Sequence, residues 1–376
     1  MSGESSPRQF EAVGGHKSSI FYGKPTRDGR STLQKTTTAW EIMYYLAMEL
    51  AKEDAFKQHP ITEHPHVDEA RAKFIHAAGK LAVFTSTLFS IHFPEKYMTK
   101  SAALKPYVGR ANEWILMEAG APARGAVLAP LFNELFDGAE QLKGFNEEYD
   151  TGIWGIGLVD ETSGMQRPCI MDVKLGFIRH SPLTPEEKVA RMMKKEHNSL
   201  VRNTALRICG CRRYIHDTSN NEGAAATLIC ERFGKDIGYA ISDVRVLSTC
   251  LTAFMSIGEP LAERKENEQL DFHPEVMGAI TSAEQVHMKQ RIRHIRAEIE
   301  SLLHFFEGTP DGTFMLQHMA FVSASVLLLY DAADSSARAK LRFIDFARST
   351  WRKFNFDEPT IGFIQGLKNL DAYLSF

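Results

Sequence analysis

The pattern of apolar and polar residues is clearest in one central stretch of the chain, residues 168–176. This stretch is a mostly apolar run of the kind that forms a buried strand, yet it contains Asp172 and Lys174. The two side chains are two positions apart, so they lie on one face of a strand. Burying an acid and a base side by side is costly unless they pair with each other or meet a ligand. The stretch therefore predicts either a structural ion pair or a site for phosphates and hydroxyls, where Gly176 lets a ligand approach the backbone.

Other blocks of the chain predict helices and one hairpin. Large side chains recur at helical spacing in residues 40–49 and again, as a long amphipathic stripe, in residues 286–306. The second helix could dock a regulatory partner such as calmodulin, but packing in the core is the expected role of such a stripe. Residues 321–330 and 341–347 are two apolar strand candidates separated by a polar turn, which predicts a hairpin that ends with Asp345.

A basic helix is predicted directly after the central strand. Thr184 and Pro185, followed by two glutamates, are typical of a helix start with Thr184 as the N-cap. Lys188, Arg191 and Lys195 recur on one face of this helix. Such a stripe is usually a solvated face. After a phosphate-handling strand, however, several cations can bind a polyanion through charge-assisted hydrogen bonds.

The N-terminal part predicts a small sheet and a helix. Residues 13–16 and 19–22 are short strand candidates joined by a glycine turn, and a Gly/Ser/Thr loop follows them. Lys24 and, seventeen residues later, Glu41 early in the helix have the arrangement by which many kinases hold ATP phosphates. A surface lysine and an unrelated surface glutamate are the alternative.

Composition and charge limit the partners of the chain. The 376 residues carry a net charge of only −3, so the overall field does not favour nucleic acid, and an anion site must come from local clustering of cations. No segment approaches the roughly 20 apolar residues of a membrane span. Five cysteines without zinc-like spacing indicate reduced thiols and a cytoplasmic or nuclear location. His59, His64 and His66 lie in a polar loop that is more typical of a solvated segment than of a zinc site.

Two motifs resemble those of a known family. Pro168, Asp172, Lys174 and Gly176 follow the order Pro-x-x-x-Asp-x-Lys-x-Gly, which is similar to the signature of the inositol polyphosphate kinases. Asp345, within Ile-Asp-Phe, is similar to the second signature of that family. The order of the two motifs along the chain matches the family as well.

The resemblance implies a two-lobed α+β fold with ATP in the cleft between the lobes. A small N-terminal antiparallel sheet plus a helix would face a larger C-terminal lobe. The expected divisions are a flexible N-terminus (1–8), an N-lobe (9–158) and a C-lobe (159–376). The N-lobe would carry a long helical insertion at about residues 50–150, whose purpose the sequence does not reveal.

The resemblance also assigns roles to individual residues. Asp172 would hold the ATP ribose, Lys174 would face the substrate and the transferred phosphoryl group, and Asp345 would bind Mg²⁺. The further ATP contacts would be Lys24, oriented by Glu41, and the hinge backbone at Val159, Asp160 and Glu161. The substrate phosphates would be bound by Lys174, Lys188, Arg191, Lys195 and Arg348.

The stretch 187–214 looks most like the inositol hexakisphosphate kinase branch. This predicts transfer of the γ-phosphoryl group of Mg-ATP to a soluble, highly phosphorylated inositol, giving a diphosphoinositol phosphate. Arg348 stands where the family often has a histidine, and arginine cannot accept a proton, which favours a phosphate acceptor over a hydroxyl. Two alternatives stay open. One is a multikinase acting on hydroxyls of lower inositol phosphates, and the other is a weakly active scaffold, suggested by the insertion and by the altered serine motif at 324–327. The sequence indicates no particular protein partner.

Overall fold

The computed structural model describes most of the chain in nine segments. These are residues 20–53, 69–110, 113–181, 184–197, 199–217, 228–265, 270–272, 280–354 and 357–374. The expected N-terminal tail at 1–8, the strand candidate at 13–16 and the histidines between 59 and 66 lie outside them.

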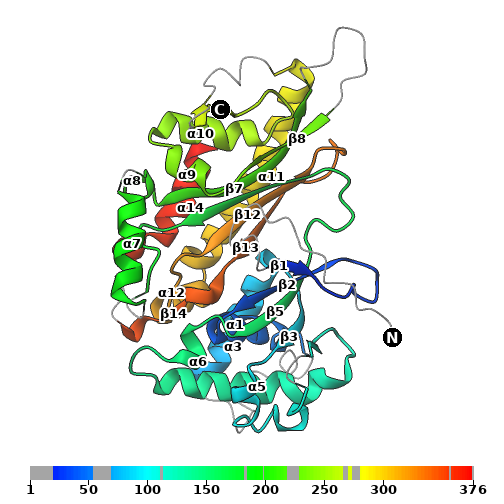
Figure 1. Cartoon of the computed structure of the whole chain (residues 1–376), viewed down its shortest axis with the longest axis vertical. Coiled ribbons are helices and arrows are strands. Elements are labelled where there is room, and N and C mark those ends of the chain that lie inside the picture. The colour runs from blue at the N-terminus through cyan, green and yellow to red at the C-terminus, as the bar shows by residue number, and fades with distance from the viewer. Residues whose placement is uncertain are drawn as a thin grey trace.

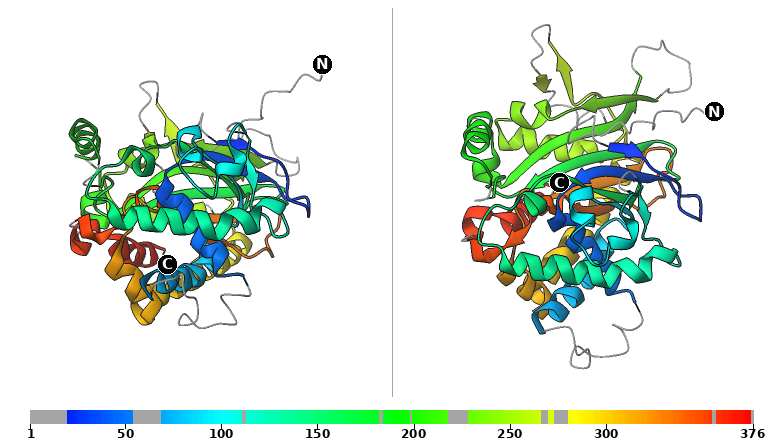
Figure 2. Two further views of the ribbon diagram at one scale, coloured as in Figure 1. Left: turned by 90° about the horizontal axis from the view of Figure 1, so that it is seen from below. Right: turned by 60° about the horizontal axis from the view of Figure 1, so that its bottom comes forward.

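The N-terminal part is built on a five-stranded antiparallel sheet in the order β1-β2-β5-β3-β4. Its strands are β1 (Ile20–Tyr22), β2 (Thr32–Thr37), β3 (Leu88–His92), β4 (Ile115–Leu116) and β5 (Trp154–Val159). The accompanying helices are α1 (Ala39–Leu50), α3 (Glu69–Leu81), α4 (Glu95–Met98), α5 (Pro122–Gln141) and α6 (Glu147–Asp150). Figure 1 shows this part in the lower half of the view, and Figure 2 shows α5 running across it.

Two features of this sheet differ from the sequence predictions. Residues 32–37 read as part of a polar loop, but they form β2, which pairs with β5 along its whole length. Residues 50–150 read as a helical insertion, but β3 and β4 lie within them and complete the sheet beside β5. In both cases pairing with a neighbouring strand outweighs a weak local pattern. Part of the supposed insertion is therefore a structural component of the N-terminal half.

The C-terminal part contains a second five-stranded antiparallel sheet, in the order β13-β12-β6-β7-β8. Its strands are β6 (Pro168–Leu175), β7 (Leu206–His216), β8 (Leu228–Phe233), β12 (Ser325–Asp331) and β13 (Lys340–Ile344). The predicted central strand and the predicted hairpin, β12–β13, are confirmed. Lys174 on β6 lies opposite Ser325 on one side and opposite Arg207 on the other. With helices around two antiparallel sheets, the predicted α+β class is confirmed.

Helices and short strands surround the second sheet. The helices are α7 (Glu186–Glu196), α8 (Val201–Thr204), α9 (Asp236–Ala240), α10 (Val244–Phe254), α11 (Ser282–Gly308), α12 (Pro310–His318), α13 (Glu358–Ile361) and α14 (Phe363–Tyr373). Two small ribbons pair β9 (Ala262–Arg264) with β10 (Leu270–Phe272), and β11 (Met319–Ala320) with β14 (Thr350–Trp351). The apolar stripe of α11 is buried, which confirms that it packs in the core. Among the described helices, none is long and apolar enough to cross a membrane.

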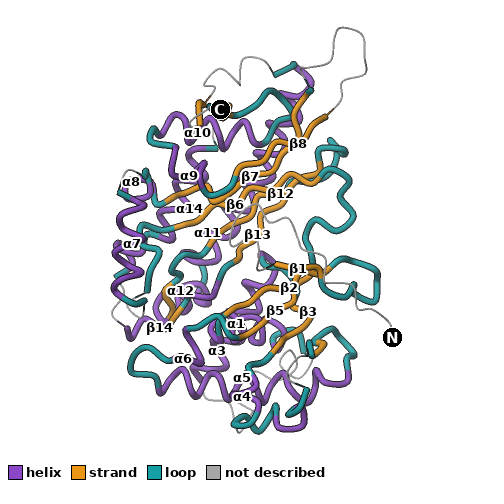
Figure 3. Tube along the Cα trace, viewed as in Figure 1, coloured by secondary structure: helices purple, strands orange, loops and turns teal. Residues whose placement is uncertain are grey.

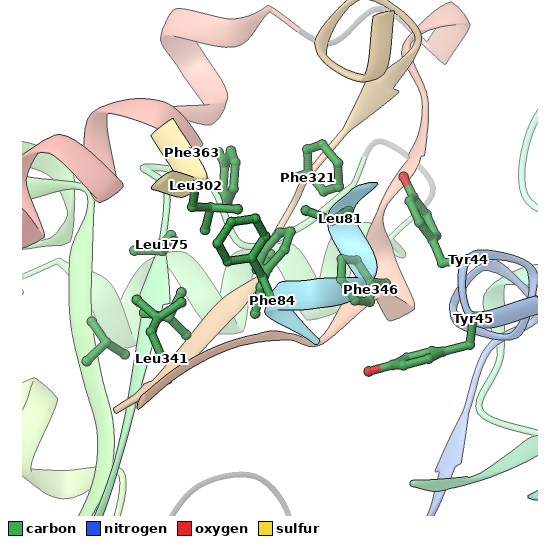
Figure 4. Packing of buried hydrophobic residues seen from close by; sticks show 14 of the residues in the cluster. Tyr44, Tyr45, Leu81, Phe84, Leu175, Leu302, Phe321, Leu341, Phe346 and Phe363 are labelled. Carbon is green, nitrogen blue, oxygen red and sulfur yellow. The ribbon is translucent and has the colours of Figure 1, made fainter. Parts of the chain in front are cut away.

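Buried aromatic rings join the two halves in one core. Tyr44 on α1 stacks on Phe346, which follows β13, with ring centroids 5.0 Å apart. Phe346 in turn packs edge-on against Phe343 on β13, and Phe343 packs against Phe363 on α14. Figure 4 shows Tyr44, Phe346 and Phe363 in this cluster. All twelve residues of α1 are buried, so this helix is enclosed by the protein.

Candidate active site

A carboxylate held between two lysines lies where the two sheets meet. Asp345 follows β13, and its Oδ1 lies 3.2 Å from the Nζ of Lys35 on β2. Its Oδ2 lies 2.8 Å from the Nζ of Lys174 on β6. The side chain of Asp345 is nevertheless 34% exposed. One carboxylate thus links a cation from each half and remains accessible to a ligand.

The backbone at Asp345 explains how its carboxylate reaches this position. Asp345 has a φ of +67°, the left-handed conformation that aspartate adopts more readily than most residues. This conformation ends β13 and turns the chain into a short 3₁₀ helix over Phe346–Arg348. The amide of Phe346 donates to Glu41 Oε1 at 3.3 Å, so the turn is anchored to α1. Strain of this kind costs on the order of 1–3 kcal/mol and concentrates at functional sites.

Glu41 orients Lys35, not Lys24. Glu41 is fully buried, and its Oε1 lies 3.1 Å from the Nζ of Lys35, while the hydroxyl of Thr37 donates to Oε2. Lys24 is exposed before the turn that leads to β2. The prediction that Glu41 orients Lys24 is therefore wrong. The physical reason is that β2 lies inside the sheet and runs directly into α1, which brings Lys35 onto Glu41.

The charges in this cluster stabilise one another. Burial alone would raise the pKa of Asp345, but the ammonium groups of Lys174 and Lys35 outweigh it and lower the pKa below its ordinary value. Burial would lower the pKa of Lys35, yet the carboxylates of Glu41 and Asp345 raise it above its ordinary value. Lys35, Lys174 and Asp345 therefore meet as charged groups at neutral pH.

Asp172 is buried on the same strand as Lys174. Among the described residues, nothing donates a hydrogen bond to its Oδ1. Burial raises the pKa of Asp172, Lys174 opposes that rise, and the nearby negative charge of Asp345 adds to it. A buried acceptor without a partner is unfavourable, so this oxygen is suited to a donor that a ligand brings. Its predicted contact with the ATP ribose stays a prediction.

Gly176 has a structural reason to be glycine. Its φ is +102°, and a Cβ built on it would lie 2.5 Å from the carbonyl oxygen of Ile361. Its amide donates to the carbonyl of Ala205 at 2.8 Å. The close approach that this glycine permits is therefore an approach of the protein's own backbone, whereas the sequence predicted the approach of a ligand.

The predicted hinge is the segment that links β5 of one sheet to β6 of the other. The amides of Val159 and Asp160 donate to carbonyl oxygens of the chain itself. Glu161 forms an ion pair with Arg342 on β13, with Oε2 2.9 Å from Nε. Since two of the amides are engaged within the protein, a contact with adenine at this hinge would need other backbone groups of the segment, and it stays a prediction.

The predicted basic helix, α7, begins without the cap that the sequence indicates. Its N-cap is Pro185, and the Thr184 hydroxyl accepts a hydrogen bond from the amide of Ser181 in the preceding loop. The Thr184 capping prediction is therefore wrong, although the helix itself is confirmed. All eleven residues of α7 are at least partly exposed.

Cations gather where α7 faces the end of the C-terminal sheet. Burial, together with the positive charges of Arg348 and Arg191, lowers the pKa of Lys188. Arg348 also lies near Asp345, whose charge opposes the lowering of the Arg348 pKa by burial. Lys195 is exposed on the same helix. The charge of Lys188 is therefore influenced by Arg191 and Arg348, and Arg348 is influenced by Asp345 in turn.

Residues 155–375, more than half of the chain, match the family model described as inositol polyphosphate kinase. The chain belongs to the inositol polyphosphate kinase family. Both motifs singled out in the sequence, around Asp172 and around Asp345, lie within the matched residues.

Curated relatives from this family are similar at low identity. Mouse inositol hexakisphosphate kinase 1 is 23% identical over 222 residues, which cover 54% of this chain and 47% of the relative. Mouse inositol hexakisphosphate kinase 3 is 27% identical, covering 58% and 49%. Inositol polyphosphate multikinase beta from Arabidopsis thaliana is 27% identical over 199 residues, covering 50% and 56%. The chain therefore spans about half the length of the curated relatives that it matches.

Two solved structures of inositol phosphate multikinases are weakly similar to this chain. One has 19% identity and a TM-score of 0.41, covering 58% of this chain and 83% of that one. The other, multikinase Ipk2 of S. cerevisiae in complex with ADP and Mn²⁺, has 17% identity and a TM-score of 0.40, covering 62% and 86%. At this level of similarity, no atomic detail of those structures can be transferred to the site around Asp345.

Three residues beside the cation cluster carry no role in the sequence predictions. Burial lowers the pKa of His180, with Glu196 opposing and Arg348 adding to the shift, so its imidazole is neutral at pH 7. The backbone carbonyl of Arg179 accepts from Arg348 Nη1 at 2.5 Å. Arg207 faces Lys174 from β7. Arg179 and His180 lie in a loop without a local pattern, and only their order after Gly176 could have drawn attention to them.

The donor set around Asp345 fits a divalent cation that is shared with phosphates. In the described part of the chain, no cluster of three or more His, Cys, Asp or Glu residues could hold a metal by itself. Mg²⁺ at nucleotide sites commonly takes one or two carboxylates and completes its shell with phosphate oxygens and water. An accessible Asp345 with Asp172 nearby matches that requirement, and the assignment of Mg²⁺ to Asp345 stays a prediction.

Proposed function

We propose that this chain is an ATP-dependent kinase that transfers the γ-phosphoryl group to a highly phosphorylated inositol. The proposed acceptor is inositol hexakisphosphate, and the product is a diphosphoinositol phosphate. The observation that carries the proposal is the bridge Lys35–Asp345–Lys174, in which one accessible carboxylate binds a cation from each sheet.

Phosphoryl transfer needs positioning and charge neutralisation rather than a nucleophilic side chain. Lys35, held by Glu41, would donate to the phosphates of ATP from the N-terminal half. Lys174 would contact the transferred group and the acceptor from the C-terminal half. Mg²⁺, bound by Asp345, would supply further charge neutralisation between the phosphates. Asp172 would accept from the ribose hydroxyls.

The identity of the acceptor rests on the number of cations near the site. The positive charges of Arg348 and Arg191 act on Lys188, and Lys195 lies one turn beyond Arg191 on α7. Several cations suit a ligand with many phosphates. The similarity to inositol hexakisphosphate kinases points the same way. Arg348 cannot accept a proton from a hydroxyl, which suits an acceptor oxygen that is already ionised.

The proposed reaction balances without a general base. An ionised phosphate oxygen of the inositol attacks Pγ of ATP, the new P–O bond forms, and the bond from Pγ to the bridging oxygen breaks. ADP leaves with the electron pair. A hydroxyl acceptor would require a proton acceptor in addition, and that is the chemistry of the multikinase alternative.

Turnover with Mg-ATP on inositol tris-, tetrakis-, pentakis- and hexakisphosphates in parallel, with separation of the products, tests the proposal. A product more anionic than hexakisphosphate is the expected result. Turnover on the lower phosphates alone would replace the proposal with the multikinase function. Absence of turnover on all four substrates would leave the scaffold function. Asp345→Asn is the matched control, because asparagine keeps the shape of the side chain and tolerates a left-handed backbone.

A further inference from the structure

The two oxygens of Asp345 each contact a lysine from a different sheet. Oδ1 lies 3.2 Å from the Nζ of Lys35 on β2, and Oδ2 lies 2.8 Å from the Nζ of Lys174 on β6. Figure 3 shows the strands of the two sheets approaching each other at β2 and at β13, the strand that precedes Asp345. The carboxylate that we assign to the metal therefore faces two ammonium groups.

Lys174 is held in place by neutral groups as well as by Asp345. Its Nζ donates to the carbonyl of Ser323 and to the hydroxyl of Ser325, both at 3.0 Å. Ser325 is fully buried, and Ser323 has a φ of +61°, a conformation that a serine keeps only where the surrounding structure fixes it. Together with Asp345, the two serines use all three hydrogens of the ammonium group. Lys174 therefore cannot turn away from Asp345 without losing two further hydrogen bonds.

Lys35 is fixed from the opposite side of Asp345. Its Nζ lies 3.1 Å from Oε1 of Glu41, which is fully buried on α1. The hydroxyl of Thr37 and the amide of Phe346 hold Glu41 in turn. If Lys35 moved away, it would leave this buried carboxylate without its cation, which is strongly unfavourable. Both lysines are thus anchored by groups other than Asp345.

This arrangement opposes a divalent cation that approaches Asp345 alone. One carboxylate charge faces two anchored ammonium charges, so an added dication meets net positive charge. The side chains of Asp345, Lys35 and Lys174 are 34%, 22% and 19% exposed, so dissolved ions screen this repulsion only in part. Phosphate groups bind ammonium groups through charge-assisted hydrogen bonds and also bind divalent metals. They would supply the negative charge that the cluster lacks.

We propose that Lys35 and Lys174 exclude a divalent cation from Asp345 until the phosphates of a nucleoside triphosphate neutralise the two lysines. Metal and nucleotide then bind interdependently, and each raises the affinity for the other. This inference rests on the proposed function, because it takes Asp345 as the metal ligand and the two lysines as phosphate contacts. The alternative is a bridge that only joins the two halves and leaves metal affinity unaffected.

Removal of one lysine tests the exclusion without any turnover. The probe is Mn²⁺, and electron paramagnetic resonance of the free ion measures its affinity for the protein in the absence of nucleotide. Lys35→Met is expected to bind Mn²⁺ at least about 10-fold more tightly than the wild type, since one of the two repelling charges is gone. Lys80→Met, at the exposed end of α3, is the matched control for the change in net charge and should leave the affinity unchanged. Equal affinities of folded Lys35→Met and wild type would overturn the inference.

Two further variants place the metal and guard against misfolding. The Lys35→Met, Asp345→Asn double variant should lose the gain in affinity, and a gain that persisted would mean that the ion binds elsewhere, contrary to the inference. Circular dichroism checks the fold of Lys35→Met, because this variant removes the cation beside the buried Glu41. If it does not fold, Lys174→Met makes the same comparison from the other sheet, and an unchanged affinity there would refute the exclusion.

Nucleotide provides the second measurement. A saturating non-hydrolysable ATP analogue should raise the Mn²⁺ affinity of the wild type by a larger factor than that of Lys35→Met, because part of the repulsion is already absent in the variant. Equal factors would contradict the coupling. These titrations contain no inositol phosphate, so they stand even if no inositol phosphate is turned over. Failure of the proposed acceptor is thereby distinguished from failure of the coupling.

Discussion

Substitution of Lys35 tests the lysine that the structure, rather than the sequence, places at the centre of the site. Lys35→Met removes a cation that lies 3.1 Å from Glu41 and 3.2 Å from Asp345. Glu41 is fully buried and, among the described residues, would keep its bonds to Thr37 and to the amide of Phe346. Breaking a buried pair costs about 3–5 kcal/mol. The side chain of Lys35 is 22% exposed, which favours the lower end, near 3 kcal/mol.

Urea unfolding and turnover with Mg-ATP measure the two consequences separately. The Lys35→Met, Glu41→Gln double variant should recover about 1–2 kcal/mol of the loss, because no uncompensated carboxylate remains. Turnover should stay at least about 100-fold below wild type in both variants, as expected for loss of a donor to the reacting phosphates. Lys24→Met distinguishes the two candidate lysines, and it should change stability by less than about 0.5 kcal/mol. If Lys24→Met lost as much activity as Lys35→Met, or if the double variant were less stable than Lys35→Met, the reasoning would be refuted.

Three further predictions concern backbone strain, thiol exposure and pH. Gly176→Ala should destabilise the protein by more than about 2 kcal/mol, because its φ is +102° and the added Cβ would lie 2.5 Å from the carbonyl oxygen of Ile361. Gly125→Ala, where an added Cβ on α5 meets open space, should instead stabilise the protein by about 0.5–1 kcal/mol. Thermal melts of the two variants compare these effects. Cys230, the exposed member of the five cysteines, should react rapidly with a thiol reagent and the four buried ones only after unfolding; rapid labelling of two or more would contradict the burial. The lowered pKa of Asp345 contributes stability that is present above the unfolded pKa, near 3.8, and is lost as pH falls through the folded value. Asp345→Asn should therefore show a shallower loss of unfolding free energy than wild type below about pH 4, by up to about 1.4 kcal/mol per pH unit, and equal slopes would refute the ion pairing.

The features that the sequence predicted correctly have strong local patterns. The run around Asp172 is apolar and flanked by turn residues, and its burial between β12 and β7 follows from that composition. The apolar stripe of α11 and the hairpin before Asp345 have equally clear periodicity. These elements would be expected to form in any fold that buries their apolar faces.

The features that the sequence missed depend on tertiary pairing. The β2 segment reads Thr-Leu-Gln-Lys-Thr-Thr, which is too polar to stand out from a loop, and it becomes a strand because β1 and β5 pair with its two edges. Because β2 is not recognisable from its sequence, Glu41 was predicted to orient Lys24, whereas in the structure it pairs with Lys35 on β2. The strands β3 and β4 have five and two residues, so no periodicity could reveal them. The arginine at 179 lies in a loop, where nothing but its burial in the folded protein distinguishes it.

The enclosure of α1 has a consequence for how nucleotide would enter under the proposed function. In many two-lobed enzymes the halves separate around a flexible connection, and each half keeps its own core. Here the helix next to Lys35 has no solvent-facing side, and its Tyr44 stacks on the residue that follows Asp345. Opening the halves would expose this packed aromatic surface and break the bridge between the two lysines. We therefore expect nucleotide exchange to proceed through side-chain and loop movements, and thermal unfolding to occur as one cooperative transition in which both halves are lost together.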